Sequence, residues 1–391
     1  CVCVSGGVPL TIPFIQAARQ RGIPLSNDSH IFLEACPAQV IGITGSSGKT
    51  TTTALVGLMA QKYYEMKQNG HRAWVGGNIG NPLIEQVDQI DEDDLVVLEL
   101  SSFQLELMTR SPQIAAILNI TPNHLDRHGS MQAYIAAKSR ILRFQHPGDV
   151  AILNRDDPGS WSLAEHLKSD LISFGFQKPD YMQNGTYIYK DAIWLQLGHE
   201  SLKMLPLEWI QLPGRHNIAN VLAACAIATA ASLALPAIQT AIEEFTGIPH
   251  RLEFIRNVNG ADWYNDSIAT APERTLAAIE AFEGPLVLLL GGRDKNLPWD
   301  DLARLIHQRV RAVVLFGEAA SLIEKALGTV KKGETLQVIS QCNTLEEAVQ
   351  EAAKLAQPGD TVLLSPGCTS FDAFKDFEER GEYFRKLVNA L

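Results

Sequence analysis

The sequence has no long hydrophobic run, few cysteines and no excess of basic residues. No stretch reaches the roughly 18 apolar residues that a membrane-spanning helix needs, so we expect no association with a membrane. The 6 cysteines among 391 residues include no Cys-x-x-Cys pair, which excludes a disulfide framework and favours a cytoplasmic location. Lys and Arg number 33 against 44 Asp and Glu, and this net charge of −11 argues against a nucleic-acid partner.

What the sequence does contain is a regular alternation of strand-like and helix-like segments. With 391 residues, 46% of them hydrophobic and 20% charged, the chain is long enough for two or three globular domains. Continuous Val/Ile/Leu runs between helical patterns are typical of parallel strands covered on both faces, and therefore of an α/β fold. An alternating stretch over 187–197 predicts a β-hairpin. The other expected strands are Gln39–Thr44, Asp94–Leu100, Ile114–Ile120, Asp149–Leu153, Pro285–Gly291, Arg311–Phe316, Leu336–Ile339 and Thr361–Ser365.

Glycine and proline punctuate the chain at one clear point. Two expected helices, over 217–235 and 236–245, lead to Thr246-Gly247-Ile248-Pro249, after which a new α/β pattern begins. A weaker boundary near Pro37 leaves one strand, one helix and a short tail before it, too little for a separate core. We expect three parts, in chain order: residues 1–36 as the remnant of an N-terminal α/β domain, 37–247 as a central P-loop domain with a mostly parallel sheet, and 248–391 as a doubly wound, Rossmann-like domain.

One glycine-rich segment, Gly45-Ser46-Ser47-Gly48-Lys49-Thr50, follows an expected strand and opens a helix. Its glycines let backbone N–H groups face a phosphate, Lys49 supplies a point charge, and Thr50 offers a hydroxyl to Mg²⁺. The strict P-loop pattern would have glycine at Ile43, yet a plain helix-capping turn does not explain Lys49 and Thr50 in this register. The segment therefore predicts a nucleotide site. By contrast, Gly76-Gly77-Asn78-Ile79-Gly80 fits either an ordinary loop or a backbone surface against a ligand.

Two strand ends beside this loop carry groups suited to a metal ion. Glu99 ends an apolar strand, and ligands in such sheets sit at the carboxyl ends of the strands. Glu99 is therefore placed to hold Mg²⁺ beside the phosphates, with a solvated strand end as the alternative. His124 follows the next strand and is a candidate second ligand, although a lone loop histidine is more often structural.

The helix that follows carries a lysine on its apolar face. Lys138 lies one turn after Tyr134 and seven residues after Met131, on the stripe that includes Ile141. A lysine on an inward face must pair, extend to solvent or lose its charge. A neutral amine reacts with CO₂ to give a carbamate, which is a carboxylate-like metal ligand. The residues alone favour extension to solvent.

Nine short segments, in order along the chain, resemble one enzyme family. They are Ile43-Thr44-Gly45-Ser46-Ser47-Gly48-Lys49-Thr50, Gly76-Gly77-Asn78-Ile79-Gly80, Glu99-Leu100-Ser101-Ser102-Phe103-Gln104-Leu105, Asn119-Ile120-Thr121-Pro122-Asn123-His124-Leu125-Asp126, Ala136-Ala137-Lys138, Gly214-Arg215-His216-Asn217, Pro249-His250-Arg251, Asn265-Asp266-Ser267 and Ser365-Pro366-Gly367-Cys368-Thr369-Ser370-Phe371-Asp372. Together they resemble the Mur ligases, and the last segment resembles the D-glutamate-adding type. Two departures stand out: the family commonly has Lys at Ile268, and most of its N-terminal, UDP-binding domain has no counterpart here.

The resemblance implies a role for each matched position. Residues implied in catalysis are Lys49, Glu99, His124 and Lys138. Two Mg²⁺ ions are implied, with Thr50, Glu99, His124 and an N-carboxylated Lys138 as ligands. The implied ATP-binding residues are Gly45, Ser46, Ser47, Gly48, Lys49, Thr50, Thr51, Asn217, Asn220, His250, Arg251 and Asp266. The implied substrate-binding residues are Asn78, Thr270, Lys295, Ser370 and Phe377.

The last expected domain has an independent signal for a ligand site. Polar groups follow three of its strands, at Asn265-Asp266-Ser267, at Gly291-Gly292-Arg293-Asp294-Lys295 and at Ser365. Strand ends of a doubly wound sheet converge on one crevice. Lys295 is suited to pair a carboxylate there, and Ser370 opens a helix whose N–H groups suit another.

The resemblance implies an ATP-dependent amide ligase. The expected reaction adds D-glutamate to UDP-N-acetylmuramoyl-L-alanine through an acyl phosphate, in the cytoplasmic synthesis of peptidoglycan precursors. We expect a monomer whose partners are ATP, D-glutamate and the UDP-linked acceptor. The alternatives are another Mur-type ligase, a folylpolyglutamate synthase, or a nucleotide-binding protein without catalysis.

Overall fold

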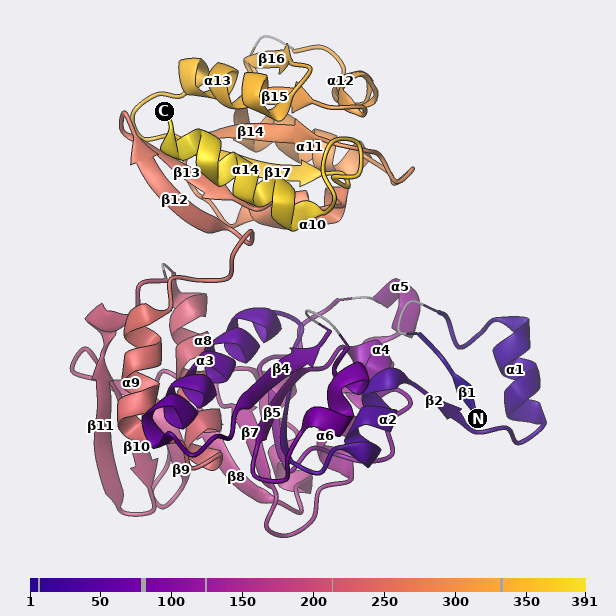
Figure 1. Ribbon diagram of the computed structural model, residues 1–391, viewed down its shortest axis with the longest axis vertical. Coiled ribbons are helices and arrows are strands. Elements are labelled where there is room, and N and C mark those ends of the chain that lie inside the picture. The colour runs from indigo at the N-terminus through magenta and orange to yellow at the C-terminus, as the bar shows by residue number, and fades with distance from the viewer. Residues whose placement is uncertain (6–7, 79–81, 124, 213, 331–332) are drawn as a thin grey trace. The chain divides into compact units, whose positions relative to one another are not determined.

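The computed structural model describes residues 1–391 except 6–7, 79–81, 124, 213 and 331–332. The chain divides into two compact units, Cys1–Thr246 and Gly247–Leu391, each with its own sheet (Figure 1). The expected division into three parts stays a prediction. Among the described helices, none is both long and apolar enough to cross a bilayer.

The first residues contain more structure than one strand, one helix and a tail. Two short parallel strands pair there, β1 (Val2–Cys3) and β2 (Leu25–Ser26), with α1 (Pro13–Gln20) between them. The expected tail is wrong, because a second helix, α2 (Asp28–Ala35), follows. Asn27 caps this helix and also donates to the backbone of Gln104, 77 residues away. A long-range contact of this kind leaves no local sequence signal.

Nine strands of the first unit form one mostly parallel sheet. Its order is β11-β10-β9-β8-β7-β6-β3-β5-β4, with antiparallel pairing only between β9, β10 and β11. The strand β3 begins and ends as predicted, and the expected hairpin is β9 and β10. The strands are β3 (Gln39–Thr44), β4 (Ala73–Gly77), β5 (Leu95–Glu99), β6 (Ile114–Ile117), β7 (Val150–Asn154), β8 (Asp170–Phe174), β9 (Asn184–Tyr189), β10 (Ala192–Leu197) and β11 (Glu200–Pro206).

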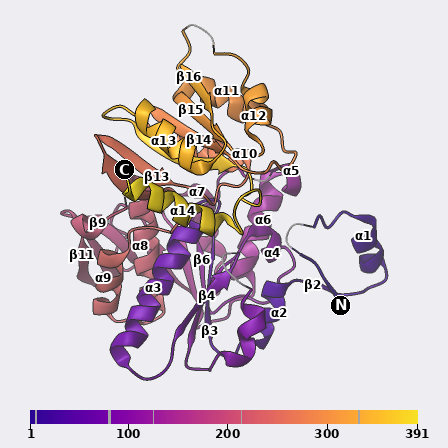
Figure 2. The same cartoon turned by 45° about the horizontal axis from the view of Figure 1, so that its top comes forward.

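Helices cover both faces of this sheet. Helices α3, α8 and α9 pack together on one face, and α2, α4 and α6 lie on the other (Figure 2). The strands are therefore apolar on both sides, which explains their continuous hydrophobic runs. The remaining helices of the unit are α3 (Lys49–Lys67), η1 (Leu83–Gln89), α4 (Ser102–Leu105), α5 (Leu125–His128), α6 (Met131–Arg143), α7 (Pro158–Trp161), η2 (Ala164–His166), η3 (Leu207–Trp209), α8 (Arg215–Ala230) and α9 (Leu235–Glu244).

The second unit has a six-stranded sheet in the order β12-β13-β17-β14-β15-β16. Only β12 runs antiparallel to its neighbour, so the carboxyl ends of β13, β14 and β17 lie at the same edge. The strands are β12 (Glu253–Val258), β13 (Ala261–Asn265), β14 (Leu286–Gly291), β15 (Val310–Phe316), β16 (Val338–Gln341) and β17 (Thr361–Gly367).

Two hydrophobic cores lie on the two faces of this second sheet. One core contains side chains of α10, α11 and α12, and the other contains side chains of α13 and α14. This is the doubly wound arrangement that the sequence predicts. The helices are α10 (Pro272–Glu280), α11 (Asp300–Arg309), α12 (Ala320–Leu327), α13 (Leu345–Leu355) and α14 (Phe377–Asn389).

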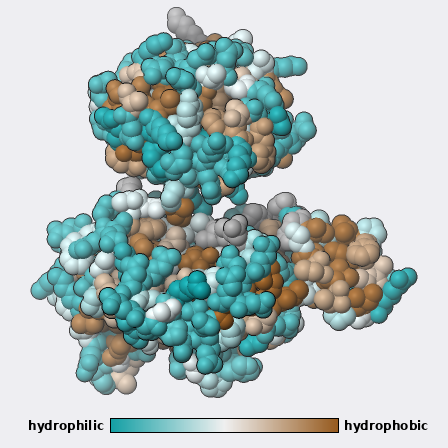
Figure 3. All heavy atoms as spheres, viewed as in Figure 1, coloured by the Kyte–Doolittle hydropathy of each residue, from teal (hydrophilic) through white to brown (hydrophobic). Residues whose placement is uncertain are grey.

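Exposed apolar side chains gather on the N-terminal segment. Val8, Phe14 and Ile23 are 36%, 68% and 38% exposed, and hydrophobic residues, drawn in brown, cover much of this part of the surface (Figure 3). The two short strands and α1 therefore bury only a few of their apolar groups, such as Ile15 and Ala18.

Candidate functional site

The glycine-rich loop joins β3 to α3 in the predicted strand–loop–helix order. Gly48 has φ +80° at the start of the helix, a conformation that favours glycine. The Lys49 amine turns back over the loop and donates to the carbonyl oxygen of Gly45 at 2.9 Å. The backbone N–H of Ser47 donates to Oδ1 of Asn119, which anchors the loop to the end of β6. The loop is thus shaped as a phosphate cradle with an amine at its centre.

Helix α8 brings two amides to the loop. Asn220 is buried, and any β-carbon on Gly48 would collide with its Oδ1. Asn220 donates to Oδ1 of Asn217 at 3.3 Å, so these two implied ATP-binding residues lie together. Glycine is therefore favoured at position 48 for two reasons: its φ is positive, and α8 approaches too closely for a side chain.

At the neighbouring strand end, Glu99 and Asn78 form a pair. Glu99 is 1% exposed at the end of β5, and its Oε1 accepts a hydrogen bond from Nδ2 of Asn78 at 2.8 Å. The backbone of Asn78 also donates to the Glu99 carbonyl, across the close approach at Gly77 (φ +99°). The other oxygen, Oε2, is buried without a hydrogen-bond partner in the described part of the chain. A buried carboxylate oxygen left in this state fits a cation.

Lys138 lies beside the same loop, fully inside the unit. Its side chain is 1% exposed, so extension to solvent, which the residues alone favoured, is wrong. The amine donates to the carbonyl of Gly45 at 2.9 Å and to Oγ1 of Thr44 at 3.3 Å. Burial lowers the pKa of the Lys138 amine to about 7, the charge of Lys49 lowers it too, and Glu99 opposes both. A substantial fraction of neutral amine is therefore present near neutral pH.

The sequence did not identify Tyr134 as a site residue. Its ring is buried below the Lys138 amine, 4.9 Å from the ring centre, and its hydroxyl lies 3.0 Å from Oγ of Ser46. Tyr134 thus joins α6 to the phosphate loop. The sequence does contain a signal for this role of Tyr134, because a buried tyrosine hydroxyl needs a polar partner and Tyr134 precedes Lys138 by one turn. The predicted ligand His124 lies outside the described residues.

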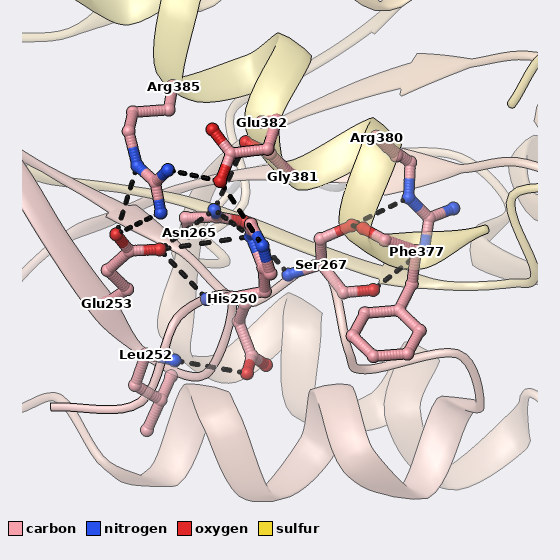
Figure 4. Close-up of polar contacts among 11 residues, drawn as sticks. His250, Leu252, Glu253, Asn265, Ser267, Phe377, Arg380, Gly381, Glu382 and Arg385 are labelled. Carbon is pink, nitrogen blue, oxygen red and sulfur yellow. Dashed lines mark hydrogen bonds and ion pairs between the residues drawn. The ribbon is translucent and has the colours of Figure 1, made fainter. Parts of the chain in front are cut away.

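In the second unit, the three predicted nucleotide-side residues differ in exposure. Arg251 is exposed, whereas His250 and Asp266 are buried. Nδ1 of His250 accepts a hydrogen bond from Asn265 at 2.9 Å, and burial lowers the pKa of this ring (Figure 4). The backbone of His250 donates to Glu253, so the ring and the backbone are both fixed from within the unit. His250 therefore holds the loop that carries Arg251.

Asp266 is a buried carboxyl group. Its Oδ2 accepts from Ser365 at 2.8 Å and its Oδ1 from the backbone of Leu252 at 3.2 Å. Burial nevertheless raises the pKa of Asp266 to about 7, because these bonds and two nearby arginines offset only part of the desolvation.

This shift predicts a change in stability with pH. The folded unit holds the Asp266 proton more tightly than the unfolded chain does, so that contribution is full below about pH 4 and is lost as the pH rises to about 7. Between about pH 4 and about pH 8 the free energy of unfolding is expected to fall, and we expect this fall to be smaller in Asp266→Asn than in wild type by on the order of 2 to 4 kcal/mol. Urea unfolding at about pH 4 and about pH 8 measures it, with Asp262→Asn, in the strand that precedes Asp266, as the control. An equal fall in wild type and Asp266→Asn would contradict the prediction.

The three expected strand ends of this unit do converge. Lys295, after β14, donates to Oγ1 of Thr270, after β13, at 3.3 Å. Arg293 and Thr369, after β14 and β17, exchange backbone hydrogen bonds at 2.9 and 3.0 Å. Ser370 is buried next to Thr369, but the helix expected to open at Ser370 is wrong, because α14 begins only at Phe377. A turn follows Ser370 instead, and its carbonyl accepts a hydrogen bond from the backbone of Phe374 at 2.9 Å. The predicted substrate residues of this unit therefore lie around one sheet edge, with the exposed Lys295 amine as a charged group suited to a carboxylate.

Comparison with known proteins assigns the family. A family model described as the Mur ligase middle domain matches residues 43–228, and one described as the Mur ligase glutamate ligase domain matches residues 250–368. UDP-N-acetylmuramoylalanine--D-glutamate ligase of Symbiobacterium thermophilum is 43% identical over 390 residues, which are 100% of this chain and 84% of that protein. The chain belongs to the Mur ligase family.

Further relatives agree with this assignment. The protein of the same name from Acetivibrio thermocellus is 40% identical to this Mur ligase over 388 residues, covering 98% of this chain and 81% of that protein. Among solved structures, MurF of Acinetobacter baumannii has a TM-score of 0.58 at 22% identity, covering 93% of this chain and 79% of that one. MurC of Thermotoga maritima has a TM-score of 0.54 at 20% identity, covering 98% and 84%. These structures share the multidomain α/β fold.

Proposed function

We propose that this Mur ligase adds D-glutamate to UDP-N-acetylmuramoyl-L-alanine at the expense of ATP, in the cytoplasmic synthesis of peptidoglycan precursors. Relatives of that name, 40–43% identical over nearly the whole chain, support the choice of substrates. The observation that carries the chemistry is the convergence of Lys49, Glu99 and Lys138 on one phosphate loop. The solved MurF of Thermotoga maritima is in complex with ADP.

The reaction proceeds in two steps. A carboxylate oxygen of the acceptor bonds to the γ-phosphorus of ATP, the bond to the bridging oxygen breaks, and ADP leaves. The amine of D-glutamate then bonds to the acyl carbon, loses a proton, and inorganic phosphate leaves with the C–O bond electrons. Phosphoryl transfer depends mainly on positioning and on neutralisation of charge. The loop N–H groups and Lys49 bind the phosphates, and Asn78, paired with Glu99, orients the acceptor.

The donor set fits Mg²⁺. Thr50 and Glu99 would hold one ion, and His124 with an N-carboxylated Lys138 would hold a second. Bound Mg²⁺ supplies neutralisation of phosphate charge. The unsatisfied Oε2 of Glu99 is the structural support for this proposal.

Carboxylation of Lys138 follows from its surroundings. The neutral amine attacks CO₂, a C–N bond forms, and one proton is released, which leaves a carbamate anion. A buried amine with a pKa of about 7 supplies the neutral nucleophile, and an anion at this position lies next to the Lys49 charge. The modification therefore converts a repulsive lysine pair into an attractive one.

The second unit supplies the amino-acid site in this proposal. Lys295 binds one carboxylate of D-glutamate, and Ser370 with the N–H groups that follow it binds the other, while Thr270 and Phe377 line the pocket. Arg251 and Asp266 serve the nucleotide, and His250 fixes their loop. Ile268 replaces the lysine common in the family, so one cation fewer is present there. We propose that the enzyme acts as a monomer.

Phosphate release from ATP tests this function. We expect release that requires both UDP-N-acetylmuramoyl-L-alanine and D-glutamate, with formation of the amide product detected by mass. Replacement of D-glutamate by diaminopimelate, or of the acceptor by a folate, separates the other ligases of this type. Nucleotide binding without release under any of these conditions would leave only a non-catalytic protein and contradict the proposal.

A further inference from the structure

Arg380 is a charged side chain inside the second unit. It is 0% exposed and lies one turn into α14, on the face that also buries Gly381, Phe384 and Val388. An arginine stays protonated in proteins, so its burial places a full positive charge in a medium of low dielectric constant. Such a charge normally has an anionic partner.

The hydrogen bonds of Arg380 all go to neutral oxygens. Its Nε donates to Oγ of Ser267 at 3.0 Å, and its terminal nitrogens donate to the carbonyls of Ser267 at 2.8 Å and Cys368 at 3.2 and 3.3 Å (Figure 4 shows the Ser267 contact). No ion pair joins Arg380 to any acidic residue in the described ranges. Asp372 acts on it only from beyond ion-pair distance, and burial lowers the pKa of Arg380 to about 10. The positive charge is therefore only partly compensated.

This charge lies next to the three strand ends at which the amino-acid pocket is predicted. Ser267 follows β13, Cys368 follows β17, and a β-carbon on Gly292, after β14, would be 3.0 Å from a terminal nitrogen of Arg380. These are the three strand ends that carry Thr270, Lys295 and Ser370. Oγ of Ser267 accepts from Nε of Arg380 and also donates to the backbone of Phe377 at 2.8 Å, so Arg380 is joined through Ser267 to Phe377, another predicted pocket residue.

We propose that Arg380 is a specificity-determining, positioning residue, whose buried charge makes this pocket select an amino acid with an anionic side chain. The proposal rests on the proposed function, because it takes the pocket at this sheet edge to be the D-glutamate site. A ligand that brings a negative charge compensates Arg380, whereas a neutral isostere such as D-glutamine leaves it uncompensated. In this proposal Arg380 favours an anionic side chain through the electrostatic potential of its charge, whereas Lys295 contacts the carboxylate directly.

The test compares charge with shape at one position. Arg380→Gln removes the charge, Arg380→Lys retains it without the planar fork, and Lys386→Gln removes an exposed charge from the same helix. We expect Arg380→Gln to raise the KM for D-glutamate about 10- to 100-fold and to leave the KM for ATP within about twofold. Its preference for D-glutamate over D-glutamine, by turnover or competitive inhibition, falls by a similar factor. Arg380→Lys keeps most of the preference, and Lys386→Gln equals wild type.

A purely structural role gives a different result. If Arg380→Gln loses turnover with D-glutamate and D-glutamine alike, or if the KM for ATP rises as much as that for D-glutamate, the proposal is overturned. If Arg380→Gln does not fold, Arg380→Lys decides: a folded variant that has lost the preference overturns the proposal, and one that retains it supports it. If the wild-type enzyme does not use D-glutamate, the proposed function is refuted instead. This outcome is seen before any variant is made, so the two failures can be distinguished.

Discussion

Replacement of Lys138 by alanine is expected to lower ligase turnover at least about 1,000-fold. The side chain is 1% exposed and its amine contacts the phosphate loop at Gly45, so its removal takes a nitrogen ligand away from the loop and leaves a buried space there. If the working form is the carbamate, a small carboxylate such as acetate enters the space left by the side chain and restores part of the activity. Turnover is measured by phosphate release with and without added acetate.

Two controls separate chemistry from folding. Arg143→Ala removes an exposed cation from the same helix and is expected to leave turnover unchanged. Thermal unfolding of Lys138→Ala measures the stability of the variant. The buried amine has a pKa of about 7, so the folded state releases a proton that the unfolded chain keeps up to about pH 10. The lysine therefore destabilises the fold most below about pH 7. Full activity in Lys138→Ala, or a rescue equalled by chloride, would remove the carbamate from the mechanism.

Most of the strands that could be predicted from sequence are central ones, although β8, inside the first sheet, was not predicted and the edge strand β16 was. The strand β3 and the neighbouring β5 and β6 are buried on both faces, so their residues form continuous apolar runs. The strand β4 (Ala73–Gly77) escaped prediction because its glycines are typical of a loop, and they are tolerated there because β5 and Leu83 pack closely against them. Edge and capping elements depend on distant contacts, which a local pattern does not contain.

The same distinction applies to the candidate site. Glu99 follows from the rule that ligands lie at strand ends, and Lys138 from a charged residue on an apolar helical stripe. The second rule also applies to Arg380, three residues after Phe377 and four before Phe384, although no role was predicted for it from the sequence. Networks such as Arg385 with Glu253, 132 residues apart, could not be predicted, because they depend on how α14 packs on β12.

Replacement of Glu99 by glutamine is the second change with a large expected effect. The variant keeps the shape of the side chain and an oxygen that accepts from Asn78, but it puts an amide where the carboxylate oxygen Oε2 has no hydrogen-bond partner in the described structure. If that oxygen holds Mg²⁺, the loss of one negative charge weakens the ion and leaves phosphate charge uncompensated in the transition state. We expect turnover to fall about 100- to 1,000-fold or more, and half-maximal activity to need more Mg²⁺.

A magnesium titration of turnover, together with ATP binding in the presence and absence of Mg²⁺, distinguishes this cause from a general defect. Asp93→Asn is the matched control, because Asp93 precedes the same strand at its opposite end and is exposed. In Glu99→Gln the affinity for ATP with Mg²⁺ is expected to fall toward the affinity without it, whereas Asp93→Asn keeps the wild-type difference. A Glu99→Gln enzyme with low turnover but an unchanged response to Mg²⁺ would assign Glu99 to orientation of Asn78 and the acceptor. The unsatisfied oxygen favours the metal, since orientation of Asn78 uses only Oε1.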